Sequence, residues 1–314
     1  MISDARWQNR TDPGGVKTAV KESKLIWGLK VTFYLFLGGV GSGALGLTAF
    51  LNLIYKGQYD QVNNVGAWIG LLAVAIGVLL LMADLGVPSR SWRLVFNRDS
   101  MISIGSIILS LFLLIAGASV SLSLSFFPWY GDYAVSQTVG ILGVILAFAT
   151  AAYTGLLLGV VKARPFWNTP LLPILWVVSS ISAGIASVTL MSTLFAVNLR
   201  WDQTVLLGRV EMYLLVAELV MIGLYLLVMH NSAPVAARSV YLLVKGRLSL
   251  TFWIGLVVLG LVLPLVIYLG NLGGPIIFIA DFMVLIGAFL LRYIFLRSGL
   301  RALVPGESIE DSYM

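Results

Sequence analysis

The sequence contains no cysteine and a single histidine among its 314 residues. Without cysteine the protein cannot form a disulfide, a thiolate zinc site, an iron–sulfur ligand set or the covalent link of a c-type haem. One histidine also excludes a haem b held by two histidines of this chain. We therefore expect neither haem nor an iron–sulfur cluster here, so any redox chemistry has to use a bound small molecule or a partner.

Charged residues are scarce as well, at 11% of the chain, whereas hydrophobic residues make up 59%. A soluble domain carries about 25% charged residues, and this protein has too few to cover a water-exposed surface. The composition therefore predicts an all-α polytopic membrane protein. Anionic lipid headgroups of the bilayer, or an acidic protein partner, account for the net charge of +6 without a nucleic-acid ligand.

Eight apolar stretches are long enough to cross a bilayer as helices, since a crossing needs about 20 residues. They are 29–55, 65–84, 102–127, 134–161, 171–197, 205–230, 250–270 and 275–296. We expect two four-helix bundles, 29–161 and 162–296, between a polar N-terminal segment (1–28) and a polar C-terminal tail (297–314). No cleavable signal peptide is expected, because the first segment lacks an apolar core.

Lys and Arg are distributed unequally between the two ends of these stretches. Seventeen lie on the side of both termini, which also carries the polar loops 84–100 and 233–249, and three lie on the other side: Lys56, Arg200 and Arg209. The positive-inside rule therefore predicts a multi-pass protein of the cell (inner) membrane with both termini in the cytoplasm.

Three polar residues are expected near the terminus side of the first four stretches: Lys30, Asp84 and Tyr153. Tyr153 precedes the basic loop 162–164 by nine residues, which places it about 13 Å below the helix end at 1.5 Å per residue. A buried hydroxyl at that depth needs a hydrogen-bond partner. Together the three could hold a quinone carbonyl. Taken singly, Tyr153 could be a packing residue, Lys30 a headgroup anchor and Asp84 the partner of Arg90 or Arg93.

A second group of ionisable residues lies in the later stretches. Its members are Glu211, Glu218, Tyr225, His230 and Asp281. Residues 211, 218 and 225 share one helix face, and intramembrane carboxylates mark functional sites. One hypothesis is a proton path along 211–230. The other is that Glu211 pairs with Arg209 while Glu218 bonds to a neighbouring helix.

Glycine and hydroxyl residues are concentrated in two stretches. In the first stretch Gly39 and Gly43 are four residues apart, a spacing that lets another helix or a flat ligand approach the backbone. Tight helix packing is the favoured interpretation. The Ser and Thr residues between 179 and 193 are likewise interpreted as packing residues.

Segment 152–173 carries Tyr-Thr-Gly from Tyr153, Arg-Pro-Phe-Trp-Asn from Arg164 and a leucine–proline run that ends at Pro173. In this order it resembles the NrfD/PsrC family, the integral membrane subunits of polysulfide-reductase-like respiratory complexes. The loop Asp84-Leu-Gly-Val-Pro-Ser-Arg90 and the glycine-rich first stretch are also similar to the family. The similarity covers the first five stretches and is most specific at 153–168.

The resemblance implies a membrane anchor subunit of a respiratory oxidoreductase, which exchanges electrons between a membrane quinone (menaquinone or ubiquinone) and an iron–sulfur partner. The quinone site would lie in the first four stretches, with Tyr153 as the quinone-binding tyrosine. The family's polar position early in the first helix falls on Lys30 or Thr32, and Asp84 would exchange protons at the mouth. Proton translocation through the second group of ionisable residues is a further expectation.

The partners implied by the resemblance are a ferredoxin-like iron–sulfur subunit and a larger catalytic redox subunit, for which a molybdopterin enzyme is one candidate. Residues expected to meet the iron–sulfur subunit are Arg90, Arg93, Lys162, Arg164 and Trp167. In known complexes of the family this partner lies on the outer face, on the side of the termini. The charge bias instead favours the cytoplasm, and we expect the cytoplasmic side.

A function from another class is an ion-coupled secondary transporter that uses Glu211, Glu218 and Asp281. Such transporters are built from repeats and from helices broken in mid-membrane. The sequence shows no clear internal repeat, and Pro264 is the only proline deep in a stretch, where a kink is expected. The sequence therefore favours the respiratory interpretation.

Overall fold

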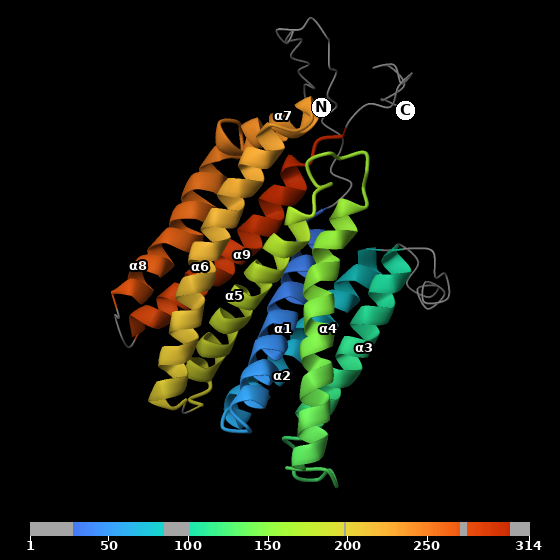
Figure 1. Ribbon diagram of the computed structural model, residues 1–314, viewed down its shortest axis with the longest axis vertical. Coiled ribbons are helices and arrows are strands. Elements are labelled where there is room, and N and C mark those ends of the chain that lie inside the picture. Colours follow the sequence, from blue (N-terminus) through green and yellow to red (C-terminus); the bar gives the residue numbers. More distant parts are fainter. Residues whose placement is uncertain (1–27, 85–100, 198, 271–274, 302–314) are drawn as a thin grey trace, which may run out of the picture.

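The structure, a computed structural model, describes residues 28–84, 101–197, 199–270 and 275–301. Eight helical spans within these ranges are long and apolar enough to cross a membrane, which confirms the predicted all-α membrane architecture. The helices run roughly along one axis (Figure 1). We call the end where α1 begins and α9 ends face A, and the opposite end face B.

Successive spans alternate in direction between the two faces. They are α1 (Leu29–Ile54), α2 (Asp60–Asp84), α3 (Met101–Ser121), α4 (Tyr133–Gly159), α5 (Leu171–Leu194), α6 (Trp201–His230), the continuous pair η2 (Thr251–Val262) and α8 (Leu263–Leu269), and α9 (Pro275–Ser298). The predicted stretches have the same order, and their ends lie within six residues of the observed ones.

The prediction of a loop over 233–249 is wrong in part. This segment contains a further helix, α7 (Pro234–Val244), at face A (Figure 1). Pro234 occupies the first turn, where its missing N–H costs nothing. Ala236, Val240 and Leu243 are buried whereas Tyr241 is exposed. This three-to-four spacing of buried residues is that of an amphipathic helix, and it is the signal that the sequence analysis missed.

The kink expected at Pro264 takes the form of a change in helix type. The span is a π-helix (η2) as far as Val262 and an α-helix (α8) from Leu263 onward. Proline has no N–H to continue the ladder of helical hydrogen bonds, and a widened turn before it accommodates that gap.

Helix α1 lies in the middle of the fold, and α5 approaches it very closely. A Cβ atom on Gly43 of α1 would overlap the carbonyl of Ser180 of α5, and one on Gly184 of α5 would overlap the backbone of Gly43 and Ala44. Helix α5 also packs against α2, α4, α6 and α9. Because α5 contacts helices of both predicted sets, the division into two four-helix bundles stays a prediction.

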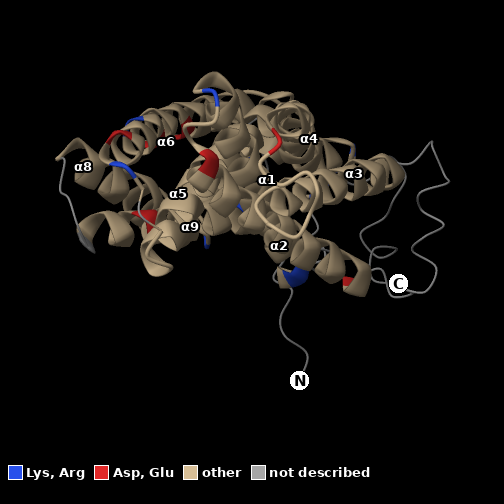
Figure 2. Cartoon of the chain, turned by 90° about the horizontal axis from the view of Figure 1, so that it is seen from below, with Lys and Arg blue, Asp and Glu red and all other residues tan. Residues whose placement is uncertain are grey.

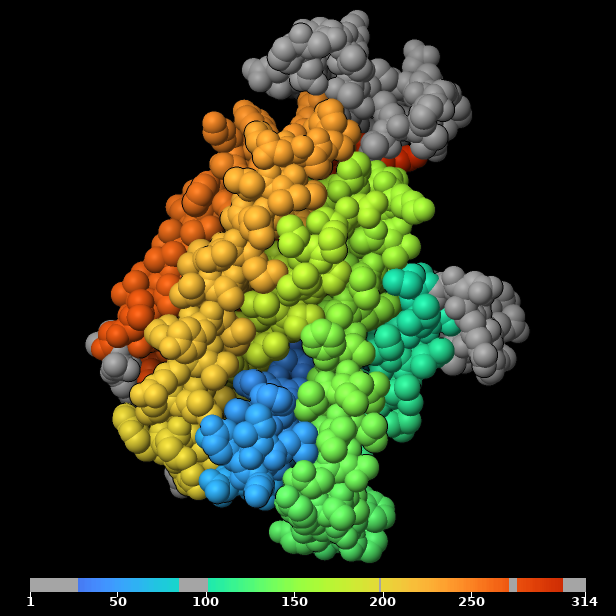
Figure 3. All heavy atoms as spheres, in the orientation of Figure 1, coloured from blue at the N-terminus to red at the C-terminus, as the bar shows by residue number. Residues whose placement is uncertain are grey.

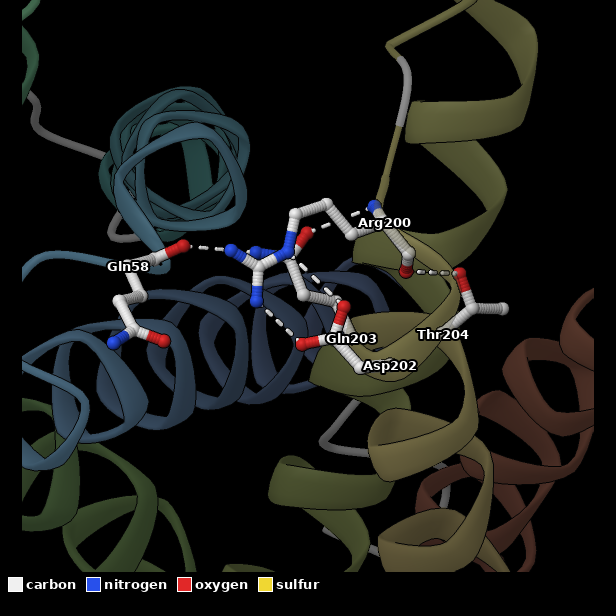
Figure 4. A network of polar contacts seen from close by, with 5 residues as sticks. All are labelled: Gln58, Arg200, Asp202, Gln203 and Thr204. Carbon is white, nitrogen blue, oxygen red and sulfur yellow. Dashed lines mark hydrogen bonds and ion pairs between the residues drawn. The ribbon is translucent and has the colours of Figure 1, made fainter.

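At face B a polar network ties the α1–α2 turn to the start of α6 (Figure 4). The Gln203 amide nitrogen donates to the carbonyl of Gln58 at 2.9 Å, while its amide oxygen accepts from the Arg200 N–H at 3.0 Å. The ion pair of Arg200 with Asp202, at 2.5 Å, is more than half exposed and therefore contributes little to stability. The network therefore joins the start of α6 to the α1–α2 turn at face B.

The segment that leads into α4 projects beyond the other helices at face B (Figures 1 and 3). Its large side chains Phe126, Trp129 and Tyr130 are exposed, as is Tyr133 in the first turn of α4. Aromatic side chains with a polar end favour the boundary between lipid and water. The exposed Trp129, Tyr130 and Tyr133 are therefore suited to the lipid–water boundary at face B.

Candidate functional site

A cavity of about 240 Å³ lies among α1, α2, α3 and α4 in the half of the protein nearer face A. Ten of its fourteen lining residues are aliphatic or glycine, and the four polar ones are Tyr34, Asp84, Tyr153 and Thr154. Asp84 is exposed at the end of α2, whereas Tyr153 is 6% exposed. The cavity therefore extends from a carboxylate at face A to a phenol inside the helices.

Tyr153 owes its position in the cavity to a glycine on the neighbouring helix. Its ring lies where a Cβ atom of Gly105 of α3 would be, so any other residue at 105 would displace the phenol. Thr154 beside it donates to the carbonyl of Ala151 at 2.7 Å and closes that wall of the cavity. The structure thus places Tyr153 and Asp84, two of the predicted residues, in one cavity.

Tyr34 is a cavity residue that the sequence analysis missed. It lies on α1 and lines the same cavity as Tyr153 and Asp84. Val31, Tyr34, Leu35 and Gly38 all line the cavity. Their spacing of three and four residues is that of one face of a helix, which is the signal that identifies Tyr34.

Lys30 and Thr32 lie outside the cavity wall. Lys30 is exposed at face A, and Thr32 is 2% exposed but absent from the lining. Both flank Val31, whose side chain faces the cavity, so a helix turns theirs in other directions. The resemblance to the family pointed to these two residues, whereas Tyr34 is the polar residue of α1 that lines the cavity.

The residues predicted to meet an iron–sulfur partner differ in accessibility. Lys162 is exposed at face A. Arg164 is 8% exposed, donates to the Gly299 carbonyl and stacks 4.7 Å from the Trp167 ring centroid. Burial, with the nearby charge of Arg301, lowers the pKa of Arg164. Arg90 and Arg93 lie outside the described residues.

Trp167 is completely buried, and its indole N–H donates to the Phe295 carbonyl of α9 at 2.8 Å. Together with Arg164 it ties the α4–α5 segment to the end of α9. Both side chains are buried, whereas Lys162 is the exposed one among the described residues of this set.

The helices carry few charged residues (Figure 2), yet three carboxyl groups are completely or almost completely buried among α5, α6, α8 and α9. Asp281 accepts from the hydroxyls of Thr189 at 2.7 Å and Tyr268 at 2.5 Å. Glu211 accepts from Ser182 at 2.6 Å and interacts electrostatically with Asp281. Glu211 therefore faces α5, whereas Arg209, its expected partner, is exposed.

Glu218 continues this series toward face A. Its carboxyl group bonds to the hydroxyl of Ser179 and interacts electrostatically with Glu211 and with Arg292 of α9. One oxygen of Glu211 and one of Glu218 have no hydrogen-bond partner among the described residues. We call Asp281, Glu211 and Glu218 the carboxyl series.

The hydroxyl partners of the carboxyl series are residues that the sequence analysis took for packing. Ser179, Ser182 and Thr189 lie three and seven residues apart on α5, so they share a helix face, and each serves a different carboxyl group. That common face was visible in the sequence. Its meaning depended on which helix lies opposite, which the sequence did not show.

Tyr225 and His230 do not extend the carboxyl series. The Tyr225 hydroxyl donates to the carbonyl of Phe166, in an aromatic cluster with Phe295. His230 is exposed at the face-A end of α6. The buried carboxyl groups therefore form a series from α9 to α6 beside α5 that does not include Tyr225 or His230.

The protein matches the family described as polysulphide reductase, NrfD, over residues 18–304. It belongs to the NrfD family. Curated relatives include a chain of the polysulfide reductase of Wolinella succinogenes, 28% identical over 88% of this protein and 94% of the relative. The NrfD homolog of Haemophilus influenzae is 29% identical, again over 88% of this protein and 94% of the relative. A subunit of the selenate reductase of Mesobacillus selenatarsenatis is 22% identical over 89% of this protein and 75% of its own length.

The NrfD match extends from before α1 to beyond α9. Both the cavity of α1–α4 and the carboxyl series of α5–α9 therefore lie within the part of the sequence that the family covers. The resemblance noted at 153–168 and the eight spans agree with this membership, and the protein is an integral membrane member of the NrfD family.

Proposed function

We propose that this protein is the quinone-reactive membrane subunit of a respiratory oxidoreductase complex. The observation that carries the proposal is the apolar cavity of α1–α4, with two phenols inside it and a carboxylate at its mouth. A quinone has a flat apolar ring with two carbonyl oxygens, so an apolar wall with hydroxyl donors matches its chemistry. A bound menaquinone or ubiquinone supplies two-electron, two-proton redox chemistry.

Each polar residue of the cavity has a distinct task in this proposal. The hydroxyls of Tyr153 and Tyr34 donate hydrogen bonds to the quinone carbonyl oxygens and orient the ring. Asp84, exposed at face A, exchanges protons between the cavity and the water outside it. Lys30 anchors α1 among the lipid headgroups, and buried Thr32 supports the helix from outside the cavity.

The proposed partner for electron exchange is an iron–sulfur subunit docked at face A, with a larger catalytic subunit behind it. Two relatives are named as one chain of a polysulfide reductase and one subunit of a selenate reductase, and these names support membership of a complex with other subunits. Exposed Lys162 belongs to this docking surface, and so do Arg90 and Arg93 in our proposal.

We infer that face A lies in the cytoplasm. Arg292 has to be removed from the count of basic residues on this side, because its guanidinium is completely buried inside the spans. Sixteen basic residues then remain on the face-A side against three at face B. A bias of this size still favours the cytoplasm for face A.

Mild-detergent purification from the native membrane tests the proposed function. We expect the protein to be recovered with an iron–sulfur protein, a larger redox subunit and bound quinone, measured by mass spectrometry, iron analysis and solvent extraction. Recovery of the protein alone, free of iron and quinone, would contradict the proposal and favour an ion-coupled transporter that uses Glu211, Glu218 and Asp281.

A second function is proposed for the carboxyl series, which begins near face B and ends at Glu218. Carboxyl groups kept inside the membrane with hydroxyl partners suit the uptake of protons. We propose that the series takes up protons from face B and that their movement is coupled to quinone turnover.

Glu218→Gln is expected to abolish coupled proton movement while the complex still assembles, because an amide cannot take up the proton. The measurement is acidification or alkalinisation of proteoliposomes during quinone turnover. Asp202→Asn, on the same helix but exposed, is the matched control and should behave as the wild type. Normal proton movement in the Glu218 variant would remove this residue from the path.

A further inference from the structure

A buried cation lies between the carboxyl series and the cavity. Arg292 of α9 is completely buried, and its Nε donates to the carbonyl of Leu35 of α1 at 3.2 Å. One terminal nitrogen donates to the carbonyl of Ala288 at 2.8 Å and to the hydroxyl of Ser179 at 3.2 Å. The other donates to the hydroxyl of Ser180 at 3.1 Å. The guanidinium is thus bonded to α1, α5 and α9 together.

The guanidinium fits against α1 because Gly39 has no side chain. A Cβ atom on Gly39 would overlap the Nη2 atom of Arg292 and would lie 2.8 Å from the hydroxyl of Ser180. Of the two interpretations of the glycine-rich segment, close approach of another helix therefore holds at Gly39, and the group that approaches is the side chain of Arg292.

Arg292 contacts both the cavity helix α1 and the hydroxyl partner of Glu218 on α5. Leu35, whose carbonyl it binds, lines the cavity of α1–α4. Ser179, whose hydroxyl it binds on the other side, also bonds to Glu218, and Glu218 is the carboxyl group that interacts electrostatically with the guanidinium. Arg292 therefore stands where the series of polar groups from face B meets the wall of the cavity.

A guanidinium cannot pass a proton along such a series. It has five N–H donors and no acceptor, and it stays protonated in proteins, so it can neither take up a proton nor release one. Its fixed positive charge also repels a proton that approaches through water, as an arginine does in water channels. The hydroxyls of Ser179 and Ser180 both accept from this guanidinium, and that of Ser179 also bonds to Glu218.

We propose that Arg292 is an electrostatic barrier that keeps protons of the carboxyl series from crossing into the quinone cavity. Its fixed positive charge stands between Glu218 and the cavity, so that between turnovers a proton entering from face B stops at Glu218, while the cavity exchanges protons through Asp84 at face A. The inference rests on the proposed proton path, and it adds the element that prevents passive leakage between the two faces.

The test is passive proton conductance, measured without quinone turnover, in proteoliposomes of the intact complex with an imposed potassium gradient, valinomycin and an internal pH dye. Arg292→Gln should raise the proton leak about tenfold over the wild type, which corresponds to a barrier lowered by about 1.4 kcal/mol. Glu218→Gln added to Arg292→Gln should return the leak to the wild-type value. A wild-type leak in folded Arg292→Gln would overturn the proposal.

Arg292→Lys separates charge from packing. Lysine keeps the positive charge beside Glu218 but loses the forked hydrogen bonds to α1 and α5, so its leak should stay near the wild-type value. Equal leaks in the Lys and Gln variants would overturn the proposal, because disturbed packing would then explain both. The readout needs no quinone turnover, so failure of this inference is distinguishable from failure of the proposed quinone function.

Arg292→Lys also covers the case in which Arg292→Gln does not fold. This variant keeps the positive charge, so a leak about tenfold above the wild-type value in the folded Lys variant would overturn the proposal.

Discussion

Tyr153→Phe is expected to lower quinone turnover of the complex at least about tenfold, which is about 1.4 kcal/mol at the barrier. The substitution keeps the ring that fills the space beside Gly105 and removes only the hydroxyl that would bind a quinone carbonyl. Steady-state quinol oxidation or quinone reduction by the purified complex measures the effect, with all subunits quantified in the same sample.

Tyr133→Phe provides the control for this variant. Tyr133 is on the same helix, exposed at the opposite face and outside the cavity, so its hydroxyl should not affect turnover. If Tyr153→Phe and Tyr133→Phe turn over quinone equally well in intact complexes, Tyr153 is a packing residue of the α3–α4 contact and the proposed quinone role is wrong.

Gly184→Val is expected to destabilise the protein by about 3 kcal/mol, since even the first carbon of the new side chain would overlap the backbone of α1. The overlap can be relieved only if α1 and α5 move apart. That movement would also disturb the hydrogen bonds of Arg292 to both helices. The thermal unfolding midpoint in detergent and the yield of monodisperse protein should both fall.

Gly223→Val is the matched comparison, because nothing outside the adjoining backbone of α6 lies within 4 Å of the position that a Cβ would take on Gly223. Its unfolding midpoint should stay close to that of the wild type. Equal midpoints for the two valine variants would mean that α1 and α5 are not as close as the structure has them.

The spans were predictable from the sequence because their signal is local. A run of apolar residues of sufficient length has to form a helix in lipid, whatever lies beside it. The amphipathic helix α7 was missed because its buried face is short and polar residues surround it. Family resemblance at 153–168 also depends on local sequence, and it pointed to Tyr153 before any geometry was available.

The site residues that were missed depend on which helices are neighbours. Arg292 was counted with the basic residues of the surface, since nothing in its own segment shows that Leu35, Ser179 and Glu218 surround it. Tyr225 was placed in a proton path because it follows Glu218 by seven residues, although its hydroxyl binds the α4–α5 segment. Periodicity identifies the face of a helix, whereas contacts decide what that face meets.

The order in which the residues around Arg292 follow one another in the sequence has a consequence for biogenesis. An arginine inside a lone apolar helix makes insertion into the membrane costly, by up to roughly 2.5–3.5 kcal/mol at the helix centre. Leu35, Ser179, Ser180 and Glu218 all precede Arg292, so each of these groups around the guanidinium is synthesised before it. The hydrogen-bonding groups and the carboxyl group that surround Arg292 are therefore available when helix α9 enters the bilayer. We expect the integration of α9 to depend on α1, α5 and α6 already being in place.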